Sequence, residues 1–227
     1  MAAPRSKTTV RAAAQPAWRI PRGRGGLSPG VIDEIQRARI VDSLIAVTAE
    51  RGYGATSIDR LLLHARMAVR TFHTLFESKE DCLLTAYRVL ASQVQDELAA
   101  AWDAGDQWPK KIRQVVAAAL AYAAEDPAAA RLLTVEVQAG GLDAQALYAD
   151  SVDRLAAKLS EGRDRYPEPA ALNQANERVV VAGLLTLIGN RLLAGEAELL
   201  PGCEAELTEI VLAPYLGRAQ AHRIAVS

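Results

Sequence analysis

The sequence predicts an all-α protein of about nine helices, and three observations support that prediction. Half of the 227 residues are apolar and only 5% are aromatic, and the composition is led by alanine and leucine, which favour helices. Glycine and proline gather in clusters, and between the clusters apolar residues recur at a helical period. No segment shows the β-branched alternation that is typical of strands. The chain is therefore expected to form a bundle of helices around a sizeable core.

Composition also excludes several classes of protein. The longest apolar runs, residues 115–124 and 179–188, are much shorter than the roughly 20 residues that span a bilayer. The first thirty residues hold no apolar stretch of signal-peptide length. Two cysteines, Cys82 and Cys203, are too few for a disulfide scaffold. These observations predict a cytoplasmic protein that does not bind a membrane.

The net charge of −1 hides an asymmetry along the chain. Residues 1–30 carry six basic side chains and no acidic one, whereas residues 80–227 carry 13 basic and 21 acidic ones. A basic front end is typical of proteins that bind a polyanion such as DNA. Two other interpretations stay open for this segment: a plain disordered tail, or an organellar transit peptide, although it lacks a clear amphipathic period.

Boundary signals predict the first two helices. Ser28 is a good cap and Pro29 suits the first helical position, so a helix is expected to begin there. Gly52 is expected to end it, because glycine adopts the left-handed conformation that follows many helices. Thr56, with Asp59 three residues later, resembles a capping box and predicts a short second helix.

A third short helix is expected over residues 69–76, with three apolar residues facing the core: Val69, Phe72 and Phe76. Ser78, followed by Asp81, predicts the start of a long fourth helix that runs to about residue 101. Beyond it, glycine and proline divide the chain into five more helical stretches.

The second and third helices, joined by a short turn, form a helix-turn-helix whose second helix has the size to enter a DNA major groove. Three segments sharpen this interpretation: Gly52-Tyr53-Gly54-Ala55-Thr56-Ser57-Ile58, then Thr71-Phe72-His73-Thr74-Leu75-Phe76, then Ser78-Lys79-Glu80-Asp81-Cys82-Leu83. Over residues 28–90 the chain resembles the N-terminal DNA-binding domain of TetR-family transcriptional regulators. The expected organisation is a flexible basic arm over 1–28, a helix-turn-helix domain over 29–77, and a helical effector-binding and dimerisation domain over 78–221.

Eight polar residues are predicted to contact DNA. On the third helix, the outward face would carry side chains for base and phosphate contacts, with an arginine suited to a guanine edge. Two residues stand at helix starts, where free backbone N–H groups attract a phosphate. Two arginines of the arm lie in a Pro-Arg-Gly-Arg-Gly stretch that looks like an AT-hook, which binds an A·T-rich minor groove. These residues are Arg70, Thr71, His73 and Thr74, then Ser57 and Lys79, then Arg22 and Arg24.

The turn departs from the family, which usually has Ala-Gly-Val-Ser where this chain has Ala65-Arg66-Met67-Ala68. Arg66 at a positive φ would cost about 1 kcal/mol relative to glycine. Ala68 lacks a capping hydroxyl, a loss of about 0.5–2 kcal/mol. His73 replaces the usual tyrosine. These departures put the operator sequence in doubt.

The resemblance implies that the C-terminal domain binds a small molecule and forms a homodimer through two helices. An apolar or amphipathic effector is expected because alanine and leucine dominate this part. The predicted pocket residues are Trp102, Tyr122, Glu136 and Tyr148, with Trp108 as a further candidate. The predicted dimer contacts are Leu184, Leu187, Ile188, Leu207, Ile210 and Val211, although the same residues would also suit an internal core.

Taken together, the sequence predicts a repressor that holds an operator as a homodimer and is released by an effector. The alternative is a dimeric small-molecule-binding protein whose degenerate helix-turn-helix no longer reads DNA. An enzyme is not expected, since no catalytic residues, metal-ligand spacing or cofactor-binding loop is visible in the sequence.

Overall fold

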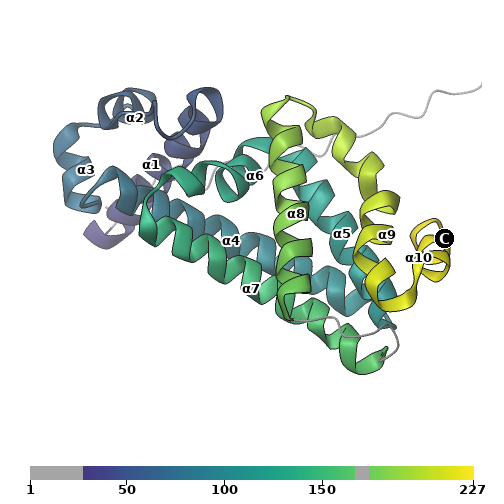
Figure 1. The fold of residues 1–227 in the computed structure, drawn as a ribbon. Helices are drawn as coiled ribbons and strands as arrows, with labels where there is room; N and C mark the ends of the chain where they lie inside the picture. The colour runs from purple at the N-terminus through teal and green to yellow at the C-terminus, as the bar shows by residue number, and fades with distance from the viewer. Residues whose placement is uncertain (1–27, 167–173) are drawn as a thin grey trace, which may run out of the picture.

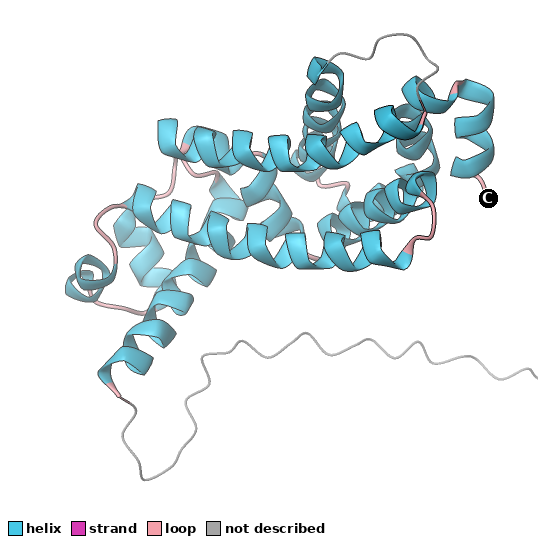
Figure 2. Ribbon diagram, turned by 90° about the horizontal axis from the view of Figure 1, so that it is seen from below, coloured by secondary structure: helices cyan, strands magenta, loops and turns pink. Residues whose placement is uncertain are grey.

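The computed structural model describes residues 28–166 and 174–227 (Figure 1). Every regular element in these residues is helical, and no strand occurs among them (Figure 2). The all-α prediction is therefore confirmed. The elements are α1 (Pro29–Arg51), α2 (Ile58–Ala65), α3 (Val69–Leu75), α4 (Lys79–Ala104), α5 (Trp108–Glu125), α6 (Pro127–Thr134), the 3₁₀ turn η1 (Glu136–Ala139), α7 (Leu142–Arg165), α8 (Gln174–Leu193), the 3₁₀ turn η2 (Ala197–Cys203), α9 (Glu204–Leu216) and α10 (Arg218–Ala225).

The described residues form one more α-helix than the sequence predicts. The last helical stretch is divided at Gly217, which has a φ of 74° and separates α9 from α10. A positive φ cannot continue an α-helix, so the chain turns sharply at this glycine. The two helices then pack against each other at the C-terminal end of the bundle.

The capping signals at the front of the chain behave largely as predicted. Ser28 Oγ accepts from the Val31 N–H, and Ser78 Oγ accepts from the Asp81 N–H at 3.0 Å. The prediction for α2 was wrong by one residue: its cap is Ser57, whose Oγ accepts from the Arg60 N–H at 3.3 Å. The Thr56 hydroxyl instead donates to the carbonyl of Gly52 at 2.9 Å.

The molecule has two parts joined by α4 (Figure 1). Helices α1–α3 form one end, and α4 extends from them into a larger bundle made by the remaining helices. α6 lies at the junction, where it packs against both α1 and α8. None of the described helices is long and apolar enough to cross a membrane.

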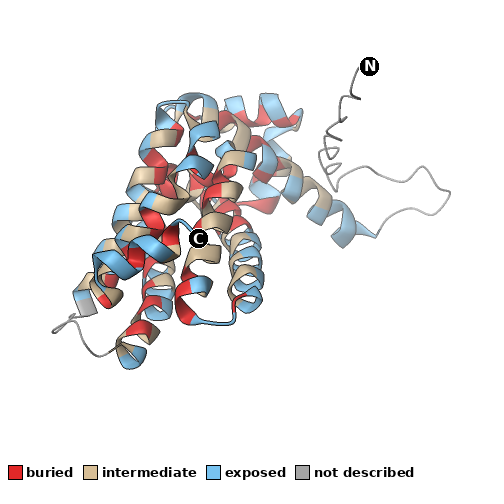
Figure 3. Cartoon of the chain, turned by 90° about the vertical axis from the view of Figure 1, so that its right-hand side faces the viewer, coloured by how far each residue is buried: buried red, intermediate tan, exposed pale blue. Residues whose placement is uncertain are grey.

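Two hydrophobic clusters form the core, and buried residues run along the inner faces of the helices (Figure 3). The first cluster joins α1–α4 to residues of α6, η1 and α7, among them Leu132 and Val137. The second lies among α5, α7, α8 and α9 and includes Trp108 and Leu207. Because the first cluster crosses the expected boundary at residue 77, the two parts share apolar packing.

Candidate functional site

The turn between α2 and α3 has the strained geometry that its sequence predicts. Arg66 has φ 53° and ψ 50°, and it is the only non-glycine residue with a positive φ among the described residues. Its backbone N–H bonds to the carbonyls of Leu62 and Leu63. Ala68 caps α3 without a side-chain hydrogen bond. α3 must therefore be held in place by packing rather than by its cap.

That packing differs from the prediction in one residue. Val69 is 50% exposed, so it does not hold α3 against the core as expected. Val69 is the first residue of α3. Phe72, Leu75 and Phe76 are buried instead, and the rings of Phe72 and Phe76 lie 5.5 Å apart.

The outward face of α3 carries the polar residues that were predicted to contact DNA. Arg70, His73 and Thr74 are exposed, and Thr71 is half-buried. The Thr74 hydroxyl donates to the carbonyl of Arg70 at 3.0 Å. The face therefore presents one guanidinium, one imidazole and one hydroxyl group to solvent from a single short helix.

Ser57 and Lys79 stand at the starts of α2 and α4, as predicted. Lys79 also has an internal role, because its Nζ donates to the carbonyls of Tyr53 at 3.0 Å and Thr56 at 2.8 Å. The ammonium lies 4.1 Å from the centroid of the Tyr53 ring, and burial lowers the pKa of Lys79. An ammonium has three donors, so one N–H remains for a phosphate. Arg22 and Arg24 lie outside the described residues.

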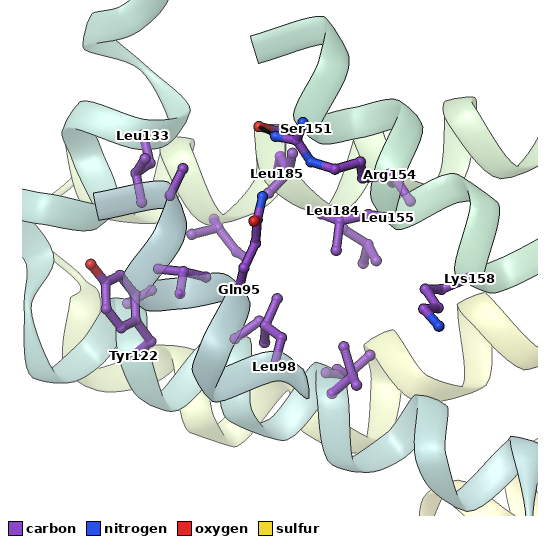
Figure 4. Close-up of a pocket in the computed structure, with 18 of the residues that line it drawn as sticks. Gln95, Leu98, Tyr122, Leu133, Ser151, Arg154, Leu155, Lys158, Leu184 and Leu185 are labelled. Carbon is purple, nitrogen blue, oxygen red and sulfur yellow. Dashed lines mark hydrogen bonds between the residues drawn. The ribbon is translucent and has the colours of Figure 1, made fainter. Parts of the chain in front are cut away.

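The larger bundle encloses an apolar cavity of about 430 Å³ (Figure 4). Residues of α4, α5, α6, α7, α8 and α9 line it, and most are alanine, valine, leucine or isoleucine. Of the predicted pocket residues, Trp102, Tyr122 and Tyr148 belong to this lining. Trp108 does not: it is buried in the second cluster, with its ring 4.9 Å from that of Tyr215.

One wall of the cavity is polar and basic. The Tyr87 hydroxyl donates to Ser151 Oγ at 2.9 Å, and Arg154 Nη2 approaches the same oxygen at 2.9 Å. Figure 4 shows Gln95 reaching toward Arg154 and Ser151, while Lys158 lies farther along the same wall. Lys158 Nζ is 4.9 Å from the centroid of the Trp102 ring. Arg154 and Lys158 are exposed, so their charges lie at the rim rather than inside.

The structure places Glu136 away from the cavity, contrary to its predicted role in the pocket lining. Its side chain is buried at the junction, and Oε2 accepts from the Tyr53 N–H at 2.6 Å. Oε1 accepts from Arg131 Nε at 2.7 Å. The carboxylate is therefore already bound on both oxygens and does not face the cavity.

The helix-turn-helix lies within a segment that matches a known protein family. Residues 40–86 match the family model described as bacterial regulatory proteins, tetR family. This segment of the chain therefore resembles the N-terminal domain of TetR-family regulators. The match covers the end of α1, the helix-turn-helix and the first part of α4. No curated protein is similar enough in sequence to count as a relative.

Solved structures extend the likeness in fold to most of this chain. The transcriptional regulator FadR from Bacillus subtilis, in complex with stearoyl-CoA, has a TM-score of 0.67 at 18% identity, covering 79% of this chain and 97% of that one. The fatty acid degradation regulator FadR from Bacillus halodurans has a TM-score of 0.69 at 17% identity, with coverages of 83% and 97%. A tetR-family regulatory protein from Rhodococcus RHA1 has a TM-score of 0.64 at 19% identity, with coverages of 79% and 96%.

The predicted dimer residues are divided between the core and the surface. Leu207 and Val211 are 2% and 1% exposed, so they pack inside the chain and have no surface for a second copy. Leu184, Ile188 and Leu207 line the cavity, and Leu187 is half-buried. Ile210 is 49% exposed. The apolar residues that do face outward on α8, η2 and α9 are Val179, Leu193, Leu199 and Ile210.

Sequence reasoning missed Arg154 and Lys158 as cavity residues. A signal was present, since the two basic residues are four apart and so share one face of a helix. That signal shows which face carries the charges but cannot show that the face borders a cavity. The described residues contain no cluster of three or more histidine, cysteine or acidic side chains that could hold a metal ion.

Proposed function

We propose that this protein is a transcriptional repressor of the TetR family, which binds an operator through α3 and is released by a small molecule in the bundle. One observation carries the proposal: a single helix, α4, begins at the helix-turn-helix with Lys79 and lines the cavity from Tyr87 to Asp103. A change in the cavity that moves α4 therefore changes the placement of the DNA-binding end. The effector must favour the released state by its own difference in affinity for the two states.

In this proposal the exposed face of α3 reads the bases. Arg70 contacts a guanine edge, Thr71, His73 and Thr74 make mixed base and phosphate contacts, and Ser57 and Lys79 hold phosphates at helix starts. Arg22 and Arg24 extend the contact into a neighbouring minor groove. The exposure of Arg70, His73 and Thr74 supports this assignment, since these side chains are open to solvent.

The cavity favours an amphipathic effector with an apolar chain and an anionic group. Its lining is almost entirely apolar, which suits a hydrocarbon chain. Arg154 and Lys158 at the rim suit a carboxylate or phosphate. The similar fold of the Bacillus subtilis protein holds stearoyl-CoA, and a fatty-acyl thioester is a first candidate for this chain as well.

A homodimer follows from the same proposal. The outward apolar residues of α8, η2 and α9 suit a contact with a second copy, and two recognition helices about 34 Å apart would match one turn of DNA. Gly183 leaves open space on α8, so a partner helix can approach its backbone closely. The working location is the cytoplasm, on the bacterial nucleoid.

The first test is selection of duplexes from a randomised pool, followed by the affinity of the selected duplex against salt. We expect an enriched motif with two half-sites and a steep loss of affinity with salt. Arg70→Ala is expected to lower affinity and reduce the salt slope by about 1. Arg218→Ala, an exposed arginine on α10, is the matched control and should change neither.

The strained Arg66 and the uncapped α3 favour one other candidate, a ligand-binding dimer whose helix-turn-helix no longer reads DNA. Selection without an enriched motif, or weak binding that survives Arg70→Ala, would favour that candidate over the repressor.

The effector class is tested by titrating stearoyl-CoA and following tryptophan fluorescence, since Trp102 lines the cavity. Saturable quenching is expected, and Arg154→Gln with Lys158→Gln should weaken binding of stearoyl-CoA but not of uncharged octadecanol. Equal weakening for both compounds would contradict the anionic subsite.

A further inference from the structure

The junction between the two parts of the molecule contains an ion pair between a buried carboxylate and a partly buried guanidinium, and neither DNA reading nor the cavity uses this pair. We infer that Arg131 and Glu136 are positioning residues for DNA binding, which hold α1–α3 in one orientation on the bundle. The inference rests on the proposed function, because that orientation matters for operator binding. Neither residue belongs to the exposed face of α3 or to the cavity lining.

Glu136 is the centre of this junction. It is 6% exposed, and its two oxygens bind different elements. Oε2 accepts from the backbone N–H of Tyr53, 83 residues away in the sequence, at 2.6 Å. Oε1 accepts from Arg131 Nε at 2.7 Å. One carboxylate therefore links η1 of the bundle to the loop between α1 and α2.

Arg131 adds a second link to the same end of α1. Its Nη1 donates to the carbonyl of Ala49 at 2.8 Å, in the last turn of α1. Carbonyls in that turn lack helical partners and carry partial negative charge, so a guanidinium is a favourable partner there. The bundle thus donates a hydrogen bond to α1 from Arg131, and it accepts one from the loop after α1 at Glu136. Two contacts of opposite polarity define an orientation better than one.

Gly52 makes this approach possible. It has a φ of 80°, and a Cβ added there would lie 3.5 Å from Glu136 Oε2. The glycine ends α1 and turns the Tyr53 N–H toward the carboxylate. A side chain here would strain the backbone, and its Cβ would lie in van der Waals contact with the Glu136 carboxylate.

The junction continues into the DNA-binding end through Tyr53. The Tyr53 carbonyl and ring both contact the ammonium of Lys79, which also binds the carbonyl of Thr56 beside the α2 cap. The contacts therefore run from Glu136 through Tyr53 to the start of α4 and the start of α2. Tyr53, Thr56 and Lys79 therefore connect the Glu136 carboxylate to the helices that carry the proposed DNA contacts.

On the other side, Arg131 belongs to α6, which lines the cavity through Ala130, Leu133 and Thr134. α6 spans only eight residues. A displacement of its cavity-lining residues therefore also displaces Arg131. Val135, directly after α6, fits against Gly189 of α8, where an added Cβ would lie 2.9 Å from Val135 Cγ2. The positioning pair thus lies between the cavity and the DNA-binding end.

The chemistry of the pair also favours positioning over simple stability. Apolar contacts such as Leu132 and Val137 in the first core cluster already attach the two parts. A buried ion pair adds little net stability over apolar residues of similar volume, because both charges lose water. Charged partners with fixed hydrogen-bond geometry do penalise every other orientation, since each would leave a buried charge without its partner.

The test measures orientation directly in the full-length protein. Spin labels are placed at Leu63→Cys on α2 and Gln107→Cys before α5, both exposed positions, in a Cys203→Ser background. Labelled protein is mixed with an excess of unlabelled protein, so that distances within one chain dominate. The distance distribution is then compared for the parent, Glu136→Gln and Arg131→Lys.

Glu204→Gln is the matched control. It breaks the Arg113–Glu204 pair, which has a similar Nε–Oε1 distance of 2.9 Å but joins α5 to the start of α9. We expect one narrow distance in the parent and in this control. In Glu136→Gln the distribution should broaden or gain a second distance, and Arg131→Lys, which keeps the charge but loses the guanidinium fork, should give a smaller change.

Operator affinity supplies the second readout, measured on unlabelled proteins with a duplex selected by the parent. If the competent orientation falls to about a tenth of the population, the apparent affinity falls about tenfold. Superimposable distributions for the parent and both junction variants would overturn the inference, whatever their affinities. Failure of the parent to select any duplex would instead overturn the proposed function, while the distance comparison still decides the inference. Thermal melting checks that each variant is folded. If Glu136→Gln does not fold, the comparison is made with Arg131→Lys alone.

Discussion

The two core clusters of this protein are built differently, and the difference fits the roles proposed for the two parts of the molecule. The first cluster, under the helix-turn-helix, is filled by large side chains such as Phe72 and Leu61, both fully buried. The second surrounds a cavity of about 430 Å³. Reading DNA requires side chains held in one place, whereas a ligand site must leave space and accept small rearrangements. A filled core and a hollow one in the same chain should respond in opposite ways to changes of side-chain volume.

Truncation in the filled core is the largest expected effect. Phe72→Ala should lower the free energy of unfolding by about 3–5 kcal/mol, because it removes buried surface and creates a new cavity. Leu98→Ala, on the cavity wall, only enlarges an existing space. It should lower the free energy of unfolding by less than about 2 kcal/mol, which is the smallest loss that is usual for truncation of a buried leucine. Urea denaturation of both variants measures the difference. Equal losses would show that the two clusters are not distinct in packing.

Enlargement sharpens the same comparison. Ala86→Phe, at a fully buried position in the first cluster, should destabilise the protein by about 1–3 kcal/mol or more through overpacking. Ala119→Phe projects into the cavity and should cost less, while weakening the binding of stearoyl-CoA. Thermal melts and ligand titration of both variants are the measurements. A severe loss of stability from Ala119→Phe would mean that the cavity is not open to a larger side chain.

A change at the cap of α3 should alter the stability of the protein by a smaller amount. Ala68→Ser supplies the hydroxyl that the cap lacks and should raise the free energy of unfolding by about 0.5–2 kcal/mol. Ala68→Val has no acceptor and is the control. Urea midpoints of the two variants decide the outcome; a gain for valine as large as for serine would point away from capping.

Relief of backbone strain at the turn is the smallest expected effect. Arg66→Gly removes the cost of a positive φ and should stabilise the protein by about 1 kcal/mol. The same change at Arg60, within α2, should instead destabilise it by about 1 kcal/mol, because glycine is a poor helix former. Opposite shifts of the melting temperature are expected, and shifts of the same sign would contradict the strain argument.

The front of the chain was predictable because its signals are local. The Ser28 and Ser78 caps, the glycine stop at Gly52 and the positive φ of Arg66 each depend on a few neighbouring residues. The errors there were small: the cap of α2 is Ser57 rather than Thr56, and Leu75 rather than Val69 packs against the core.

The rear of the chain was predictable only in class. Apolar residues at a helical period predict helices, but they do not show which apolar face meets which. Leu207 and Val211 therefore looked like dimer contacts and lie in the core. Glu136 was predicted to line the pocket, but its partners are Arg131 and a backbone N–H that is 83 residues away.

By itself, then, the sequence determined that the chain is helical, where its front helices begin and end, and that a helix-turn-helix of the TetR family stands at the front. Only the tertiary structure decided where the cavity lies, that Arg154 and Lys158 border it, and that Arg131 and Glu136 join the two parts. The physical reason is the separation along the sequence of the residues that take part in each feature. Caps, turns and helical periods act over a few residues, whereas a cavity or a junction exists only after segments far apart in the sequence have packed together.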